Sequence, residues 1–188
     1  MVTALFVDRN GIYPKLLDNW FDADKDARNY NGIDTVVCHP PCQLWVNFAS
    51  LNYKRYGGEH NRPGNDGGCF KFALDTVRMN GGVLEHPAGS KAWESFQLTK
   101  PKGIGWNKVS DNEYVCEIWQ SAYGHKARKR TWLLYVGKEC PSDGKWDRNP
   151  GTHQIGHFDI KKPVLSKKES SATPVEFAKW LIQIAAIA

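Results

Sequence analysis

Short apolar runs recur along the first 136 residues of the chain and are separated by longer stretches of mixed polarity. Each run is bounded by Gly, Pro or polar residues and has the length of a buried β-strand. The pattern therefore predicts a sheet whose strands are spread over most of the chain. The predicted strands are residues 3–7, 35–38, 83–85, 115–119 and 131–136.

The stretches between and after these runs contain helical patterns. In residues 67–80 the apolar side chains fall on one face, and Asp66 is placed to cap the first turn. Thr173, Pro174 and Glu176 match an N-cap, a first-turn proline and a capping glutamate, and predict a helix to about residue 187. Further helices are predicted at residues 13–20 and 44–53, with a short polar helical piece at 22–29.

Strands that alternate with helices predict an α/β fold with a mostly parallel sheet and helices on both of its faces. A chain of 188 residues has the size of one domain, so we expect residues 1–188 to form a single compact domain. Residues 138–172 are polar throughout and match no element. We interpret them as an irregular segment, and as the part of the chain available to face a substrate.

The composition is that of a globular protein, with 41% hydrophobic and 24% charged residues. No apolar run approaches the roughly 20 residues that span a membrane, and the N-terminus lacks the plan of a signal peptide. The five cysteines cannot all pair within the chain, which favours free thiols in a reducing compartment. We therefore expect a cytoplasmic protein with no membrane partner.

Residues able to do chemistry lie at the ends of three predicted strands. Cys42 follows residues 35–38 in the segment Pro40-Pro41-Cys42-Gln43, and Glu85 ends residues 83–85. Arg128 and Arg130 come just before residues 131–136. Since ligands bind α/β sheets beyond the carboxyl ends of the strands, we expect Cys42 at the mouth of a cleft. Glu85 and one of the two arginines should lie within side-chain reach of it.

The order of these motifs resembles that of the DNA cytosine-C5 methyltransferases. Their Pro-Cys-Gln motif is matched by Pro41-Cys42-Gln43, and the glutamate of their Glu-Asn-Val motif by Glu85. Their Gln-x-Arg-x-Arg motif is matched by residues 126–130, with Lys126 at the first position. The resemblance covers about residues 3–137. It implies a Rossmann-like, methyltransferase-type core ending in an antiparallel strand. The chain departs from the family in showing no large target-recognition domain, which would suit a compact mobile-element or phage-type protein.

The resemblance also implies roles for the matched residues. The Cys42 thiolate would add to C6 of a pyrimidine and activate C5, while Glu85 would neutralise the charge that develops at N3 and the 4-amino group. Arg130 would contact the base O2 and Arg128 the nearby backbone or loop. A duplex base would have to flip out to reach them. A thiol of ordinary pKa about 8.5 needs a positive neighbourhood, and Arg128, Arg130 and His39 could supply it.

Nucleic acid is the expected partner of such a site. The net charge of +5, eight Trp and seven Tyr suit a polyanion with exposed bases. Whether the DNA is single- or double-stranded stays open, and free nucleotides or RNA remain alternatives. We expect affinity to fall steeply with salt. The side chains predicted to meet phosphates are Lys54, Arg55, His60 and Arg62 in a loop over residues 54–68, and Lys126 and Lys129.

The cosubstrate motif departs from the family pattern. The resemblance implies S-adenosylmethionine, which the family binds with Phe-x-Gly-x-Gly, but Asp8 and Asn10 replace the glycines after Phe6. Side chains at these positions would crowd a nucleoside, so we predict weak or absent binding. Asp22 or Asp24 would hold the ribose of any nucleoside cosubstrate.

Two function classes follow from the sequence. The first is an enzyme that acts at C5 of a pyrimidine, with S-adenosylmethionine or another cosubstrate. The second is a non-catalytic DNA- or base-binding module that has kept the base pocket and lost the cosubstrate site. A zinc site at Cys38, His39 and Cys42 is disfavoured, because the spacing matches neither Cys-x-x-Cys nor His-x-x-x-His.

Overall fold

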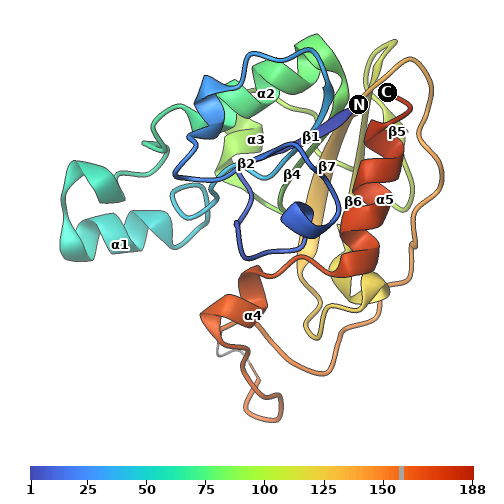
Figure 1. Ribbon diagram of the computed structural model, residues 1–188. Coiled ribbons are helices and arrows are strands. Elements are labelled where there is room, and N and C mark those ends of the chain that lie inside the picture. The colour runs from blue at the N-terminus through green and yellow to red at the C-terminus, as the bar shows by residue number, and fades with distance from the viewer. Residues whose placement is uncertain (157–158) are drawn as a thin grey trace.

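A mixed β-sheet forms the centre of the molecule (Figure 1). The computed structural model describes residues 1–156 and 159–188, and in these residues the sheet has seven strands in the order β2-β1-β3-β4-β7-β6-β5. The strands are β1 (Val2–Leu5), β2 (Trp20–Phe21), β3 (Thr35–Cys38), β4 (Gly82–Pro87), β5 (Asn107–Lys108), β6 (Glu113–Trp119) and β7 (Arg130–Val136).

The two halves of the sheet differ in direction. Strands β2, β1, β3 and β4 pair in parallel, whereas β7 runs antiparallel to β4 and to β6, and β5 runs antiparallel to β6. The prediction of a mostly parallel sheet is therefore wrong. The cause is the region after residue 105, where the chain returns through short local connections and adds antiparallel strands beside β4.

Helices cover both faces of the sheet, and this prediction is confirmed. On one face lie α2 (Cys69–Asn80) and α3 (Lys91–Ser95), and on the other lies α5 (Val175–Ala185). The remaining α-helices of the described residues are α1 (Ala49–Tyr56) and α4 (Lys167–Ser171), which lie away from the sheet in Figure 1. Short 3-10 helices occupy Tyr13–Lys15, Ala27–Asn29, Glu59–Asn61 and Gln120–Tyr123.

Strand alternation sends neighbouring residues into two separate cores. Leu84 packs with Phe70 and other side chains of α2 and α3, whereas the adjacent Val83 packs with Phe177 and Leu181 of α5. All five of these side chains are fully buried. Burying one such side chain contributes about 1.5–3 kcal/mol, so both cores stabilise the sheet.

Gly82 joins α2 to the sheet at a point where no other residue fits. Its φ is +118°, and a Cβ placed there would lie 2.0 Å from the carbonyl oxygen of Val36 on β3. The helix can therefore end at Asn80 and β4 begin two residues later. This short connection sets the register of Glu85 within the sheet.

Two predicted helices differ from the structure. Residues 13–20 form only the 3-10 turn Tyr13–Lys15, and the chain then enters β2, which pairs with β1. Helix α1 begins at Ala49 instead of residue 44 and extends to Tyr56. The reason for the late start is Trp45, which is buried in the α2 core and leaves residues 44–48 as irregular backbone.

The predicted caps had different outcomes. Asp66 accepts hydrogen bonds from the backbone N–H groups of Gly68 at 3.0 Å and Phe70 at 2.8 Å, so it satisfies a first-turn donor of α2, although the N-cap residue is Gly68. Thr173 does not cap α5, because Pro174 occupies the N-cap position with extended backbone. Within the described residues, no helix combines the length and apolar character that crossing a membrane requires.

Candidate active site

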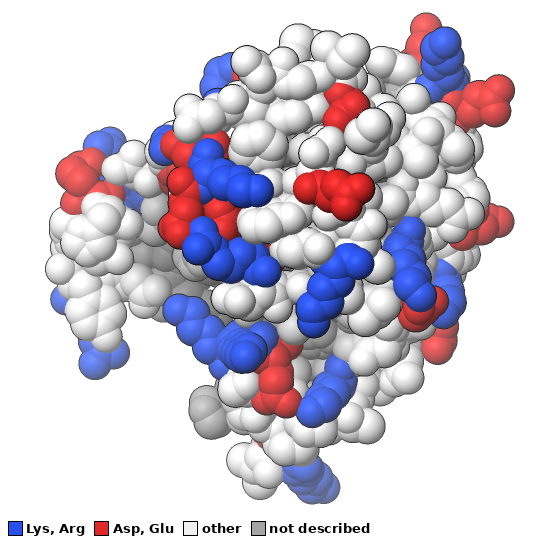
Figure 2. Space-filling view, viewed as in Figure 1, with Lys and Arg blue, Asp and Glu red and all other residues white. Residues whose placement is uncertain are grey.

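A cleft of 1590 Å³ opens beyond the carboxyl ends of β1, β3 and β4. Its walls come from residues 39–43 after β3, Glu85 on β4, residues 127–130 before β7, and the first residues after β1. Residues 167–173, which include α4, close its lower side. Figure 2 shows a hollow between the α1 region and the body of the molecule, with Lys and Arg side chains on its rim.

The segment 138–172, interpreted as irregular and substrate-facing, contributes several of these walls, among them Pro150, His153 and Lys167. It contains α4, which the sequence did not predict. Its residues 157–158 lie outside the described residues. The part of the segment between Pro150 and Ala172 therefore contributes to the cleft.

Glu85 is a nearly buried carboxylate, 12% exposed, with a hydrogen-bond partner on each oxygen. Its Oε2 lies 3.0 Å from Nδ1 of His39, and its Oε1 accepts from Nε2 of Gln120 at 3.2 Å. Burial alone would raise its pKa. The His39 hydrogen bond and the charges of His39 and Lys129 outweigh burial and lower the pKa to about 2. Glu85 is thus an ionised carboxylate in the free protein.

The hydrogen-bond chain continues from His39 to Tyr13. Nε2 of His39 lies 2.6 Å from the Tyr13 hydroxyl, and Tyr13 is 3% exposed. Burial and the charge of Glu85 raise the pKa of Tyr13 well above its ordinary value, so the hydroxyl keeps its proton. On the other side of Glu85, Gln120 also donates to Oγ1 of Thr131 at 2.9 Å. Glu85 is therefore fixed from both sides.

Cys42 borders the same cleft with a partly buried side chain. Burial and the negative charge of Glu85 raise the pKa of its thiol, and the positive charge of Lys129 offsets part of that rise. Cys42 is therefore a protonated thiol in the free protein. A substrate that screens Glu85 from the sulfur would lower the thiol pKa and favour the thiolate.

Lys129 is the cation that acts on both Cys42 and Glu85. Its Nζ donates to the backbone carbonyls of Ser171 at 3.2 Å and Ala172 at 3.0 Å. An ammonium has three N–H donors, so one remains for a ligand. Burial lowers its pKa, while Glu85 and Cys42 act in the opposite direction. The sequence placed Lys129 among phosphate contacts, but its side chain belongs to the cleft.

Arg130 and Arg128 have other partners. Arg130 donates to Glu117 from Nε at 2.8 Å and from Nη2 at 2.7 Å, and the Arg128 guanidinium lies over the ring of Trp119, 5.1 Å from its centre. The register explains the difference, because Glu85 pairs with Leu133 on β7. Odd-numbered residues of β7 share the face of Glu85, and Arg130 lies on the opposite face. Arg130 lines the same cleft as Glu85, but Glu117 engages its guanidinium, so its expected contact with a base stays a prediction.

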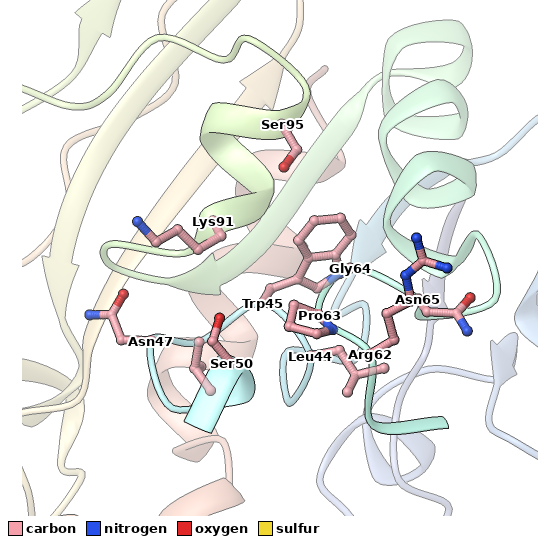
Figure 3. A pocket seen from close by; sticks show the side chains of 11 residues that line it. Leu44, Trp45, Asn47, Ser50, Arg62, Pro63, Gly64, Asn65, Lys91 and Ser95 are labelled. Atoms are coloured by element: carbon pink, nitrogen blue, oxygen red, sulfur yellow. The ribbon is translucent and has the colours of Figure 1, made fainter. Parts of the chain in front are cut away.

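The predicted phosphate contacts are dispersed. Lys126 pairs with Glu169 at 2.9 Å and Arg62 with Glu59 at 3.4 Å. Lys54 and Arg55 are exposed on the last turn of α1, outside the loop in which the sequence placed them. His60 is exposed as well, with Nε2 3.1 Å from Asn61. Arg62 lines a second pocket of 410 Å³ together with Trp45. Lys91 and Ser95 of α3 line the same pocket (Figure 3).

The region expected to hold a cosubstrate is occupied by an internal ion pair. Arg9 donates to Asp22 at 2.6 Å and also pairs with Asp24, while the backbone N–H groups of Asp24 and Lys25 donate to the other oxygen of Asp22. Phe6 directly follows β1 and has a φ of +60°, a conformation that glycine adopts without strain. The carboxylate that the resemblance assigns to a ribose is therefore engaged within the protein.

Sequence reasoning missed two residues of the site. Tyr13 was assigned to a helix, and Gln120 follows the predicted strand 115–119 without any motif. Both reach the site through contacts between distant parts of the chain, 26 residues from Tyr13 to His39 and 35 from Glu85 to Gln120. A polar residue directly after a predicted strand was the one available signal for Gln120.

In residues 1–156 and 159–188, no group of three or more His, Cys, Asp or Glu side chains is arranged to hold a metal ion. All five cysteines are free thiols. No protein-family model, curated protein or solved structure matches the chain. The function is therefore argued from the cleft itself.

Proposed function

We propose that this protein is an enzyme that attacks C6 of a pyrimidine base in DNA with the Cys42 thiolate and thereby acts at C5. The single observation that carries the proposal is the grouping of a thiol, an ionised carboxylate and an ammonium in one cleft. Cys42, Glu85 and Lys129 interact electrostatically there, beyond the ends of β3 and β4. These are the groups needed to attack, to neutralise and to hold a pyrimidine ring.

In the proposed reaction, the sulfur of Cys42 forms a bond to C6 while a ring electron pair moves toward C5 and N3. Glu85 receives the N3 and 4-amino edge of cytosine, and the free N–H of Lys129 donates to O2. Lys129 thus takes the role that the sequence resemblance gives to Arg130. C5 then bonds to an electrophile, loses its proton, and the C6–S bond breaks to restore the thiolate.

The sheet supports a Rossmann-like, methyltransferase-type core as part of the proposal. Strands β1, β3 and β4 are parallel, α2 connects β3 to β4, and β7 lies antiparallel between β4 and β6. The parallel half alone is a common arrangement in α/β proteins. The antiparallel strand beside β4 is the feature that the resemblance implies.

S-adenosylmethionine fits this cleft poorly. Asp8 and Asn10 line the cleft directly after β1, and Arg9 occupies Asp22. A nucleoside would have to displace this ion pair and pass two side chains. We therefore propose weak or absent binding, which titration calorimetry measures directly. A dissociation constant in the low micromolar range would contradict it.

The second candidate function is a base-binding module without catalysis. It is favoured by the raised pKa of the Cys42 thiol, since a neutral thiol is a poor nucleophile. Such a module would bind DNA through the same cleft, and the Glu85 carboxylate would hold the base edge. The two candidates differ in whether a bond to sulfur ever forms.

Hydrogen exchange at C5 tests the proposal without a cosubstrate. Addition of a thiolate at C6 lets C5 take up deuterium from D2O and then release its original proton. Native protein should exchange H5 of cytosine in DNA, and Cys42→Ser should slow this by at least about 1,000-fold. The matched control is Cys69→Ser, since Cys69 lines the same cleft and has no proposed role.

Mass spectrometry of the digested nucleosides provides the readout. Parallel reactions with single-stranded DNA, duplex DNA, RNA and dCMP identify the form of the substrate. Binding of DNA without any exchange by native protein would favour the binding module instead.

A further inference from the structure

We propose that Tyr13, His39 and Glu85 form a proton relay, in which His39 supplies through Glu85 the proton that N3 of the base takes up when Cys42 attacks. This inference rests on the proposed function and adds to it the source of the proton. His39 is then a positioning residue that acts through Glu85, and Glu85 is the group that touches the base.

The relay is continuous in the structure. Nδ1 of His39 lies 3.0 Å from Oε2 of Glu85, and Nε2 lies 2.6 Å from the Tyr13 hydroxyl. The side chain of His39 is 13% exposed, so little of the ring faces bulk water. His39 directly precedes the Pro40-Pro41-Cys42 segment, which ties the relay to the nucleophile in the chain.

Glu85 lacks a proton of its own to give. Its pKa of about 2 leaves it ionised at neutral pH, yet charge that develops at N3 has to be neutralised by a proton. A carboxylate can pass a proton from a neighbour to the base if that neighbour carries one. The donor must therefore be a group in contact with Glu85 that carries a proton at neutral pH.

The other groups that face Glu85 do not fit this role. Gln120 does not titrate. Burial lowers the pKa of His86 to about 4, so its ring is neutral near pH 7. Lys129 is held by two backbone carbonyls, and its free N–H is assigned to the base O2. Cys42 attacks as a thiolate, so its proton has left for solvent before N3 needs one. His39 is left, and an imidazolium carries a proton on Nδ1 that it can give to the carboxylate 3.0 Å away.

Tyr13 allows His39 to change protonation without losing a partner. A hydroxyl both donates and accepts. In the imidazolium, and in the neutral ring that remains after Nδ1 has given its proton to Glu85, Nε2–H donates to the Tyr13 oxygen. The raised pKa of Tyr13 keeps the hydroxyl intact in both states.

The proton balance closes over one cycle. As the S–C6 bond forms, the imidazolium of His39 gives its Nδ1 proton to Glu85, and the carboxyl group gives a proton to N3. When the C6–S bond breaks, N3 returns a proton to Glu85, and Glu85 returns one to His39. The Cys42 thiol gives its proton to solvent before the attack, and the thiolate regains one after the C6–S bond breaks. The proton lost from C5 also goes to solvent, so the relay is restored.

The test uses His39→Asn, which keeps an N–H donor near the position of Nδ1 but has no group that titrates. We expect C5–H exchange at pH 7 to slow by about 100-fold. The native rate should decline on the alkaline side as the imidazolium is lost, and the variant should lack this decline. If His39 only positions Glu85, His39→Asn will keep the native rate and pH profile, and the relay is refuted.

Tyr13→Phe is the companion variant. It retains the titrating ring and removes the hydroxyl, so it should keep the alkaline decline, shifted in pH, and lose less than about 10-fold in rate. Loss of the decline in this variant would contradict the assignment of the decline to His39.

A measurement without turnover checks the relay independently. Nitrogen-15 NMR of the histidine rings in the native protein should find a proton on Nδ1 of His39, facing Glu85. A neutral ring protonated only on Nε2 would overturn the relay even if the variants fail to fold. Absence of exchange by native protein would instead refute the proposed function, whereas native exchange with an unchanged His39→Asn profile refutes the relay alone.

Discussion

Glu85 and Glu117 are two carboxylates with the same low pKa, about 2, on opposite faces of one sheet. Their side chains are also equally buried, 12% and 11% exposed. Glu85 pairs with Leu133 in the α5 core and Glu117 with Trp132 in the α2 core, which places them on different faces. By burial and pKa alone the two sites are indistinguishable.

Their hydrogen-bond donors separate them. Glu117 accepts from Arg130 through two bonds and from the indole N–H groups of Trp119 at 3.1 Å and Trp132 at 3.0 Å. None of these donors gives up a proton near neutral pH. Glu85 is bound by His39, whose imidazole can take up and release a proton at the nitrogen that faces the carboxylate. A low carboxylate pKa is therefore no mark of catalysis, and the exchangeable protons around it are more informative.

The sharpest test of this difference compares Glu85→Gln with Glu117→Gln. The first should reduce C5–H exchange by about 1,000-fold, because an amide cannot pass a proton to N3. The second should change exchange by less than about 3-fold but cost about 2–3 kcal/mol of stability, since it leaves Arg130 without its partner. Exchange assays and urea unfolding measure the two effects. Loss of exchange in a folded Glu117→Gln protein would show that Glu117 also takes part in the exchange reaction.

The cations should separate in the same way. Lys129→Met removes the proposed donor to the base O2 and should slow exchange by about 30- to 100-fold. Arg130→Met, the matched change one residue away, should leave exchange within about 3-fold of native. Steady-state exchange at saturating DNA is the measurement. The reverse ranking would restore Arg130 to the role that the sequence resemblance gives it.

Acid titration should report on the Glu117 network. A folded pKa of about 2, below the ordinary 4.5, means that its stabilisation is present above pH 4.5 and is lost as pH falls toward 2. Glu117→Gln should flatten this loss by about 2 kcal/mol over that window. Urea unfolding at several pH values gives the curve. An unchanged slope would show that Glu117 has the same pKa in the folded and unfolded protein.

The smallest expected effect concerns exposed basic side chains and the salt dependence of DNA binding. Lys54 and Arg55 are exposed on α1, whereas Lys126 is paired with Glu169. Changing Lys54 and Arg55 together to Ala should reduce the log–log salt slope of DNA binding by about 1–2, equally for all sequences. Lys126→Ala should change the slope by less than about 0.5. Binding titrations at several salt concentrations decide this, and an equal effect of Lys126→Ala would mean that its ion pair opens on binding.

Local sequence patterns predicted the elements whose formation depends on residues close to one another in the chain. The strand 35–38 matches β3 to the residue, and α2 begins behind Asp66 as its periodicity and cap indicate. Helix α1 was misplaced because the burial of Trp45 is a tertiary effect that no helical pattern contains. The insertion of β7 between β4 and β6 was likewise unreadable, since apolar runs do not say which strands pair.

The candidate site likewise contains residues that local patterns indicated and residues that only long-range contacts reveal. Strand ends indicated Cys42 and Glu85, which border one cleft. Choosing Lys129 over Arg130 required the pairing of Glu85 with Leu133, because a shift of one residue exchanges the two faces. The contact of Tyr13 with His39 depends on how β1 and β3 lie side by side, and the sequence offers no measure of that.

Helix α5 has a consequence for the chain as it is made. It is the last element, and it covers Val37 and Val83 on strands that were completed long before it. Synthesis proceeds at about 5–20 residues per second, so the nascent protein spends seconds with every strand available and one apolar face of its sheet bare. During that interval it is a client for chaperones that bind exposed apolar surface, and a stalled ribosome would hold it in its most aggregation-prone form.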